Sequence, residues 1–386
     1  MMQTILFYIF IISMFFLFHT YLFYPLIVKI YSIIAAKKFV KQRESLPKVS
    51  VLIAAYNEEK VIRETVKTLL ASDYPADRFE VIVGSDNSKD KTHQIMEELA
   101  ASDERVKFYP FFERNGKPGV LNRIEEKAFG DILVFCDSNI LFDKNALIEM
   151  ASLFADKRVG GVSGEIRLKQ SKTGNQEGTY WKLESRIKDF EGQVGSLIGA
   201  NGGMYAIRRE LYWKYPVGET IQDDILMTLK VISAGYDFTY DTRAFSHEEP
   251  TASNEDEFKR KKRIQVSNLG TLRYVKEFLN PFAGFTAFAL WSHKILRWFS
   301  PHLLILVIIS NMFLLNCSPI FILSIYSIAG SFLMAILGYI SNKSGIKFLP
   351  FLLFYYFYGT LGALLAGSFK YYFKKNNATW EPTKRV

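Results

Sequence analysis

The run Val49-Ser50-Val51-Leu52-Ile53-Ala54 is short and apolar, and it ends at the polar residues Tyr56-Asn57-Glu58. A run of this length, rich in β-branched residues, predicts a buried β-strand. Residues 61–70 then place apolar side chains at helical spacing, and residues 79–83 form the next apolar run. Strands that alternate with helices in this way indicate βαβ crossovers and a mostly parallel sheet.

The same alternation continues further along the chain. A helical pattern covers residues 92–100, and residues 106–111 and 131–136 predict two more strands with a helix between them. The sequence therefore predicts an α/β domain. Because ligands of such sheets bind beyond the carboxyl ends of the strands, polar residues at those ends are candidates for chemistry.

Composition narrows the class of protein. Of 386 residues, 49% are hydrophobic and 23% charged, which excludes disordered, collagen-like and coiled-coil chains. Two cysteines, Cys136 and Cys317, cannot build a disulfide framework. No glycine-rich dinucleotide or Walker-type loop supports a dehydrogenase or a phosphate-loop ATPase. The net charge of +9 is expected of basic residues that flank membrane segments, so we predict no role in nucleic-acid binding.

The N-terminal segment predicts a retained membrane anchor. Residues 5–28 are almost continuously apolar, and about 24 residues in a helix suffice to cross a bilayer core. A signal peptide would need a basic start and a small-residue cleavage site, and neither is present. Four basic residues follow the segment: Lys37, Lys38, Lys41 and Arg43. This charge bias predicts that the chain beyond residue 37 lies in the cytoplasm.

The C-terminal part is also rich in apolar residues. Residues 254–276 form a charged helical stretch, and residues 282–298 mix aromatic and basic side chains, as interfacial helices do. Three apolar segments follow at residues 303–315, 320–340 and 348–369, and the charge bias favours an even number of crossings among them. The predicted organisation is an anchor (1–45), a cytoplasmic α/β domain (46–253), interfacial helices (254–299), transmembrane helices (300–370) and a cytoplasmic tail (371–386).

Carboxylates follow two of the predicted strands and open a later helix. They are Asp86, Asp137 with Asn139 two residues on, and the pair Asp223-Asp224. One such carboxylate suits hydrogen bonding to a nucleoside, one suits a divalent cation on a diphosphate, and a third could take a proton from a hydroxyl. Taken singly, each segment is also typical of a turn or a helix cap.

The order of these segments resembles the membrane-bound family-2 inverting glycosyltransferases, which include cellulose, hyaluronan and poly-N-acetylglucosamine synthases. The resemblance covers nearly the whole chain. It rests on Ala55-Tyr56-Asn57-Glu58, Asp86, Gly116-Lys117-Pro118-Gly119-Val120-Leu121-Asn122, Asp137-Ser138-Asn139, Gly199-Ala200-Asn201-Gly202-Gly203, Gln222-Asp223-Asp224 and the spacing from Asp224 to Gly235-Tyr236.

The resemblance implies a nucleotide-binding domain of GT-A type and a role for each matched residue. Asp224 would be the general base, and Asp137 with Asn139 would hold Mg²⁺ or Mn²⁺. A nucleotide-sugar, by resemblance a UDP-sugar, would contact Ala55, Asn57, Glu58, Asp86, Lys117, Asp137 and Arg263. Gly202, Gly203 and Asp223 would lie next to the acceptor. The acceptor would be a lipid-linked hydroxyl or a glycan at the cytoplasmic membrane face.

Two positions depart from the family pattern. Asn139 stands where the family has the second aspartate of Asp-x-Asp, and an amide oxygen ligates a hard cation without adding charge. The synthases' Gln-x-x-Arg-Trp is here Arg260-Lys261-Lys262-Arg263-Ile264, which keeps the arginine and loses the glutamine and tryptophan. The tail Thr379-Trp380-Glu381-Pro382-Thr383-Lys384-Arg385 resembles the segment that covers the bound nucleotide in polysaccharide synthases.

These departures leave two alternatives to limited sugar transfer. One is a processive exopolysaccharide synthase of poly-N-acetylglucosamine or hyaluronan type. The other is a catalytically silent subunit that binds a nucleotide-sugar. The sequence leaves the sugar, the acceptor, the linkage position and the oligomeric state open.

Overall fold

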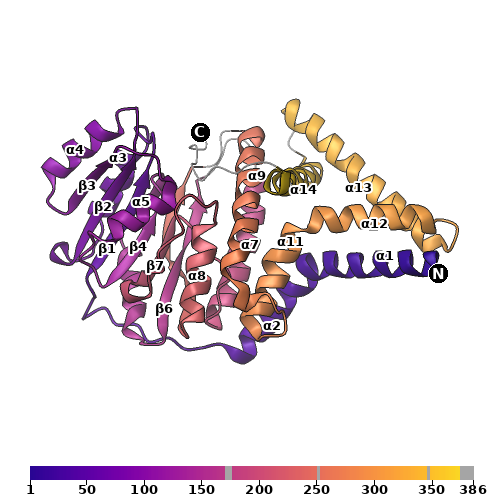
Figure 1. Cartoon of the computed structure of the whole chain (residues 1–386), viewed down its shortest axis with the longest axis horizontal. Helices are drawn as coiled ribbons and strands as arrows, with labels where there is room; N and C mark the ends of the chain where they lie inside the picture. Colours follow the sequence, from indigo (N-terminus) through magenta and orange to yellow (C-terminus); the bar gives the residue numbers. More distant parts are fainter. Residues whose placement is uncertain (170–175, 250–252, 346–347, 374–386) are drawn as a thin grey trace.

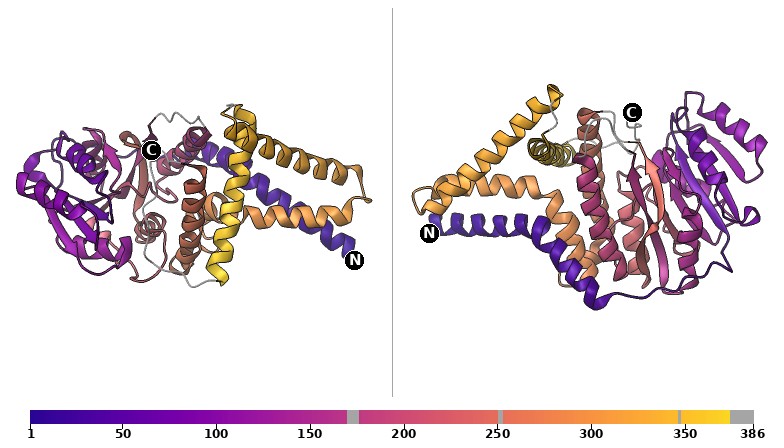
Figure 2. Two further views of the ribbon diagram at one scale, coloured as in Figure 1. Left: turned by 90° about the horizontal axis from the view of Figure 1, so that it is seen from above. Right: turned by 180° about the vertical axis from the view of Figure 1, so that it is seen from behind.

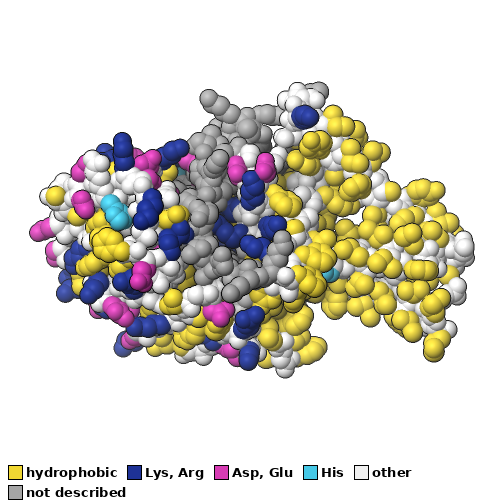
Figure 3. All heavy atoms as spheres, turned by 45° about the horizontal axis from the view of Figure 1, so that its top comes forward, with side chains coloured by type: hydrophobic (Ala, Val, Ile, Leu, Met, Phe, Trp, Pro, Cys, Tyr) yellow, Lys and Arg dark blue, Asp and Glu magenta, His cyan; other side chains and the backbone are white. Residues whose placement is uncertain are grey.

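The computed structural model describes residues 1–169, 176–249, 253–345 and 348–373. A sheet domain with covering helices forms one side of the molecule, and long helices extend from it on the other side (Figure 1). Hydrophobic side chains dominate the surface of these long helices, whereas Lys, Arg, Asp and Glu gather on the sheet domain (Figure 3). The predicted tail segment Thr379–Arg385 lies outside the described residues.

One eight-stranded sheet organises the domain, in the order β3-β2-β1-β4-β7-β6-β8-β5. Its strands are β1 (Val49–Ala55), β2 (Phe79–Asp86), β3 (Val106–Phe111), β4 (Ile132–Cys136), β5 (Ile140–Phe142), β6 (Val159–Leu168), β7 (Met204–Arg208) and β8 (Asp237–Glu248). The pairs β1–β2, β2–β3, β1–β4 and β6–β8 are parallel, and the other three are antiparallel. The predicted α/β class with a mostly parallel sheet is confirmed.

Both faces of the sheet are covered, which explains the continuous apolar runs. Side chains alternate across a strand, so in β1 Val51 and Ile53 enter one core while Leu52 and Ala54 enter the other. The surrounding helices are α3 (Ile62–Leu70), α4 (Thr92–Ser102), α5 (Gly116–Glu125), α6 (Ala146–Ser152), α7 (Gln176–Gln193) and α8 (Asp223–Ser233). Parallel strands buried in this manner lose the polar alternation of a half-exposed sheet.

The N-terminal helices join the domain to the long helices beyond it. They are α1 (Met2–Phe18), the π-helical segment η1 (His19–Phe23) and α2 (Tyr24–Ala35). At the junction Tyr24 donates a hydrogen bond to Glu191 at 2.6 Å, and buried His293 lies 2.7 Å from the same carboxylate. His293 thus has a structural role between α7 and the segment before the C-terminal helices.

That segment consists of α9 (Asn254–Thr271), α10 (Phe285–Ala289), η7 (Leu290–Ile295) and α11 (Leu296–Trp298). Leu290, Ile295 and Trp298 are buried in the same core as α8, so residues predicted to lie at a membrane interface pack on the domain. Three helices follow: α12 (Ser300–Leu314), α13 (Pro319–Lys343) and α14 (Leu349–Phe373).

By length and composition, three helices within the described residues are able to cross a membrane: Met2–Ala35, Pro319–Lys343 and Leu349–Phe373. A fourth would be the pair Phe285–Trp298 and Ser300–Leu314, which is bent by 65°. Helices α1 and α12 lie side by side, whereas α14 runs across both of them and is viewed along its axis in Figure 1 (Figures 1 and 2).

Candidate active site

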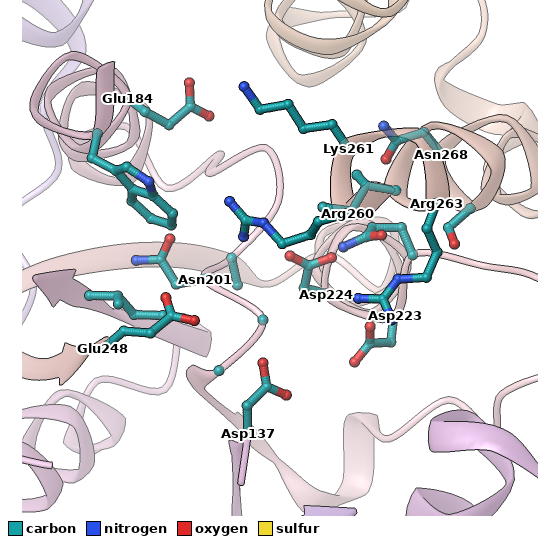
Figure 4. A pocket seen from close by; sticks show the side chains of 18 of the residues that line it. Asp137, Glu184, Asn201, Asp223, Asp224, Glu248, Arg260, Lys261, Arg263 and Asn268 are labelled. Carbon is teal, nitrogen blue, oxygen red and sulfur yellow. The ribbon is translucent and has the colours of Figure 1, made fainter. Parts of the chain in front are cut away.

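A cavity of about 2010 Å³ opens at the carboxyl ends of β1 and β4 and continues to α9 and α14 (Figure 4). It is lined by ten of the twelve predicted site residues: Asn57, Glu58, Lys117, Asp137, Asn139, Gly202, Gly203, Asp223, Asp224 and Arg263. The two others, Ala55 and Asp86, are not among the described lining residues. Four of these ten residues, Asn57, Glu58, Asp137 and Asn139, follow strands predicted from the sequence, and the other six lie elsewhere in the chain.

Asp137 and Asp224 lie next to two adjacent glycines, Gly202 and Gly203. A Cβ built on Gly202 would lie 3.3 Å from Oδ2 of Asp224, and one built on Gly203 would lie 3.2 Å from Oδ2 of Asp137. Asp137 follows β4, Gly202 and Gly203 precede β7, which pairs with β4, and Asp224 opens α8. The pairing of β4 with β7 places Asp137 beside this turn, and the start of α8 places Asp224, 87 positions further along the chain, on its other side.

Lys117 bridges the two acidic segments. Its Nζ lies 2.8 Å from Oδ1 of Asp137 and 2.9 Å from Oδ2 of Asp223. Burial alone would lower the pKa of the ammonium, but the Coulombic pull of the two carboxylates outweighs burial and raises that pKa. Lys117 therefore stays charged and holds the acids after β4 and at the start of α8 at a fixed separation.

Asp224 has the properties of a base that works near neutral pH. Burial, reinforced by the neighbouring charge of Asp223, raises the pKa of its carboxyl to about 6. Its Oδ1 accepts a hydrogen bond of 2.8 Å from the backbone N–H of Ile225. Its Oδ2 faces Gly202, where the missing side chain leaves room for a reacting group.

Lys188 is a second buried cation that the sequence did not identify. From α7 its Nζ donates to Oδ1 of Asn201 at 2.6 Å and to the backbone oxygen of Ala200 at 3.3 Å. Burial, together with the nearby charge of Lys294, lowers the pKa of Lys188 to about 8. Since Asn201 directly precedes Gly202, Lys188 fixes the turn that separates the two acids.

The oxygen ligands around Asp137 fit a hard divalent cation. The Asp137 carboxyl is 40% exposed, the largest exposure among the acids that pair with Lys117. Asn139 lines the same cavity and donates from Nδ2 to Oε1 of Glu248 at 3.2 Å. Among the described residues no group of three or more His, Cys, Asp or Glu could hold a metal ion by itself. A cation here would complete its coordination with the amide oxygen, water or a diphosphate.

Asp86 takes a different position from the other acids. Its carboxylate is fully buried and accepts hydrogen bonds from Nε of Arg114 at 3.0 Å and from the backbone N–H groups of Asn115 and Gly116 at 2.7 and 3.1 Å. It thus orders the loop that leads into α5 and Lys117. Ala55 is buried in the core beneath β1. For both residues, contact with a nucleotide stays a prediction.

Substitution of Gly202 tests the turn. In Gly202→Ala the new methyl group would stand 3.3 Å from the Asp224 carboxylate, closer than an ordinary van der Waals contact, and would fill the space beside that carboxylate. We expect kcat/KM to fall about tenfold or more, because small displacements of reacting groups are costly. The melting temperature should change little.

Gly330→Ala is the matched control, since no atom of the described residues lies within 4 Å of its added Cβ. This variant should keep wild-type kcat/KM. Wild-type activity in Gly202→Ala would show that the turn does not border the reaction site.

Comparisons with known proteins concern the family and the fold of the domain. Residues 50–216 match the sequence family described as "Glycosyl transferase family 2", which places the domain in glycosyltransferase family 2. The chain is 30% identical over 224 residues to the probable glycosyltransferase YdaM of Bacillus subtilis, covering 55% of this chain and 53% of that protein. It is 27% identical over 250 residues to the poly-beta-1,6-N-acetyl-D-glucosamine synthase of Staphylococcus aureus, with 59% of each chain covered.

Another relative is the beta-monoglucosyldiacylglycerol synthase of a Nostoc species, 29% identical over 202 residues, with 48% of this chain and 42% of the relative covered. The matched part of each of these relatives is about half of its length. Among solved structures, a mannosyltransferase from Pyrobaculum calidifontis in complex with GDP-Man and Mn²⁺ superposes with a TM-score of 0.71 at 18% identity, over 95% of this chain and 100% of the other. The fold is therefore that of the GT-A glycosyltransferases.

Proposed function

We propose that the protein is an inverting glycosyltransferase that moves a sugar from a nucleotide-sugar to an acceptor hydroxyl at the membrane face. The observation that carries this proposal is the Gly202-Gly203 turn, which lies against Asp224 on one side and Asp137 on the other. A donor diphosphate at Asp137 and an acceptor hydroxyl at Asp224 would then meet across a single turn.

The reaction needs one displacement. As the acceptor oxygen forms its bond to the anomeric carbon, the bond from that carbon to the diphosphate oxygen breaks, and the hydroxyl proton passes to Asp224. The nucleoside diphosphate leaves from the opposite face, so the anomeric configuration inverts. A pKa of about 6 keeps Asp224 ionised at neutral pH and still basic enough to accept the proton.

Charged side chains near Asp137 would hold the leaving diphosphate. Arg263 lines the cavity from α9 and has the planar donors that suit phosphate oxygens. Lys117 would exchange part of its contact with Asp137 for a phosphate oxygen. Asp137 and Asn139 would hold Mg²⁺ or Mn²⁺, which when bound neutralises charge on the diphosphate. Support for a cation comes from the Mn²⁺ in the superposed mannosyltransferase.

The domain is proposed to lie on the cytoplasmic side of a multi-pass membrane protein. Basic residues of the segment after α2 contact the sheet domain: Lys37 pairs with Asp237 at 2.5 Å, and Lys41 pairs with Glu149 at 2.9 Å. The positive-inside bias of this segment favours the cytoplasm. Nucleotide-sugars made there would reach the cavity directly.

A processive polysaccharide synthase is the second candidate, and the likeness to poly-beta-1,6-N-acetyl-D-glucosamine synthase favours it. The replacement of Gln-x-x-Arg-Trp by Arg260-Lys261-Lys262-Arg263-Ile264 favours limited transfer instead. Sizing of the products separates the two, since long chains would support the synthase.

The pH profile should follow two groups of the cavity. Asp224 must be ionised to act as the base, so kcat/KM should fall about tenfold per pH unit below its pKa of about 6. Lys188, with a pKa of about 8, loses its charge in alkaline solution and with it a strong hydrogen bond to Asn201, so kcat/KM should also fall above that value. Measurements of kcat/KM across this pH range test both the decrease in acid, which we call the acidic limb, and the decrease in alkali, the alkaline limb.

In Lys188→Arg the alkaline limb should move to higher pH, because a guanidinium does not deprotonate there. A profile of the wild-type protein that stays level well below pH 6 would contradict the role of Asp224.

A panel of nucleotide-sugars tests the proposed function. The purified protein, placed in membranes, is incubated with UDP-sugars and with GDP-sugars. Each donor is tested with Mg²⁺ and with Mn²⁺. The nucleoside diphosphate that is released is then measured. We expect release from one donor, a UDP-sugar by the resemblance of the motifs, and only with a divalent cation. No release from any donor would favour the catalytically silent subunit.

A further inference from the structure

The cavity extends over the sheet on both sides of the Gly202-Gly203 turn. Asn57 and Glu58 line it after β1, whereas Ile166 and Glu248 line it from β6 and β8. In the sheet order, β1 and the pair β6–β8 lie on opposite sides of β4 and β7. The donor is proposed to contact the residues after β1, which leaves the half of the cavity over β6 and β8 for the acceptor.

One face of α7 forms a wall of the cavity and runs away from the turn. Trp181, Glu184 and Lys188 all line the cavity, and their spacing of three and four residues places them on one face of the helix. Lys188 hydrogen-bonds Asn201, the neighbour of Gly202, at 2.6 Å. Trp181 lies seven residues nearer the start of α7, which is about 10 Å along the helix axis. This separation is comparable to the length of a disaccharide.

Trp181 has a position that differs from that of the other tryptophan in the described lining. Trp298 is 5% exposed and belongs to the core that includes α8. Trp181 is half-buried, because it packs against the core cluster that contains Ile166 and also lines the cavity. An indole supported by the core in this way offers the cavity a flat and rigid apolar surface.

Carboxylates held in fixed positions accompany this surface. The Glu184 carboxylate accepts a hydrogen bond from Lys294 at 2.7 Å, and that of Glu248 accepts one from Asn139 at 3.2 Å. Both carboxylates lie on the same side of the cavity, with Asp224 across from them (Figure 4). Carboxylate oxygens accept hydrogen bonds and do not donate them, so they suit hydroxyl groups.

We propose that the acceptor is a glycan whose terminal sugar presents its hydroxyl to Asp224 and whose second sugar stacks on Trp181. This inference rests on the proposed function and names the acceptor class for it. A pyranose ring carries C–H groups on its faces and hydroxyl groups around its rim. It therefore matches an indole face with carboxylates beside it, whereas a hydrocarbon chain would offer those carboxylates no donor.

The group transfer itself follows the displacement described above. The hydroxyl oxygen of the terminal sugar forms the new bond to the anomeric carbon of the donor, and its proton passes to Asp224. The bond from that carbon to the diphosphate breaks, and the nucleoside diphosphate leaves. Trp181 takes no part in these steps, and its role is to hold the acceptor in register with the base.

The length of the acceptor tests this assignment. The full protein in phosphatidylcholine vesicles receives the labelled nucleotide-sugar that the donor panel selects. The acceptors are methyl glycosides of glucose, N-acetylglucosamine, mannose and galactose, the β-linked disaccharide glycosides of the same sugars, and diacylglycerol. Labelled product and nucleoside diphosphate are both measured. For at least one sugar we expect the KM of the disaccharide to be about tenfold below that of the monosaccharide, because only the disaccharide reaches the indole.

Each other outcome counts against a defined part of the account. Product from diacylglycerol alone, or no product from any saccharide, would overturn the glycan acceptor and leave the proposed function intact. Equal KM values for monosaccharide and disaccharide would overturn the sugar site at Trp181. Absence of nucleoside diphosphate both here and in the donor panel would overturn the proposed function as well.

Variants of Trp181 separate stacking from packing in the core. Trp181→Leu keeps an apolar side chain against the core but removes the flat ring, so the KM for the disaccharide should rise about tenfold, to that of the monosaccharide. The KM values for the monosaccharide and for the nucleotide-sugar should stay unchanged. Trp181→Phe keeps an aromatic ring and should retain a preference for the disaccharide.

Trp213→Leu is the matched control, since Trp213 is also half-buried but is absent from the described lining of the cavity. This variant should keep the wild-type KM values. A preference for the disaccharide that survives in Trp181→Leu would contradict the proposed site.

Discussion

Asp224→Asn should lower kcat/KM for sugar transfer by about 10³-fold, within the range that a positioned general base contributes. The amide has nearly the shape of the carboxyl and keeps the hydrogen bond from Ile225, but it cannot accept the proton of the acceptor hydroxyl. Binding of the nucleotide-sugar should stay close to wild type, because the donor is held at Asp137. Release of nucleoside diphosphate and nucleotide affinity are measured on the same preparation.

Asp73→Asn serves as the control, since its carboxyl is 49% exposed and it is not part of the described wall of the cavity. This variant should behave as wild type. If Asp224→Asn retained wild-type kcat/KM, the base would have to be another residue.

Asp137→Ala should have the second largest effect, a fall in kcat/KM of about 10²- to 10³-fold, comparable to the loss of one preorganised electrostatic group. The change removes the carboxylate proposed to meet the cation and leaves Lys117 with Asp223 as its ion-pair partner. Nucleotide affinity, measured calorimetrically with and without Mn²⁺, should lose its dependence on the metal.

Removal of divalent cations from the wild-type protein should lower its nucleotide affinity to that of Asp137→Ala. The Asp73→Asn protein should respond to metal as wild type does. A metal dependence that persists in Asp137→Ala would place the cation elsewhere.

The first four strands could be predicted because parallel strands covered on both faces are continuously apolar. β6 and β8 escaped prediction for opposite reasons. β6 contains Gly160, Gly161 and Gly164, which carry no hydrophobic signal, and β8 contains charged residues such as Asp241 and Arg243. Their parallel pairing is also interrupted by two register shifts. Packing in the tertiary structure, rather than strand propensity, determines such strands.

Some residues of the candidate site could likewise be predicted from the sequence, and others could not. Asp137 and Asp224 could be predicted, because a strand end and a helix start can be recognised locally. Glu248 ends β8 and would have met the same rule had that strand been recognised. Lys188 lies within the long helix α7, where a lysine resembles any surface residue, and its burial depends on contacts with the turn at Asn201.

Asp86 shows the limit of the expectation that polar residues at the carboxyl ends of strands line the site. This expectation places a carboxylate at the edge of the sheet but does not say which way its side chain turns. The N–H groups that bind it come from Asn115 and Gly116, about thirty residues further along the chain, and no periodicity in the sequence predicts that contact.

The direction of α14 likewise could not be predicted from the hydropathy of the sequence. Its composition is that of a spanning helix, but its direction is set by close contacts with two neighbouring helices. A Cβ on Gly338 of α13 would lie 2.2 Å from the backbone oxygen of Phe351, and one on Gly367 would lie 2.7 Å from that of Lys262 in α9. Such contacts, rather than hydrophobicity, determine the tilt of a helix.

The anomeric configuration of the transferred sugar tests the central claim most directly, because a single displacement with Asp224 as base allows one outcome. The product is formed from a donor of known configuration and is examined by NMR before it can equilibrate. We expect the configuration to be inverted, with an α-linked donor giving a β-linked product. Retention would require a second displacement or a front-face reaction and would contradict the mechanism built on Asp224.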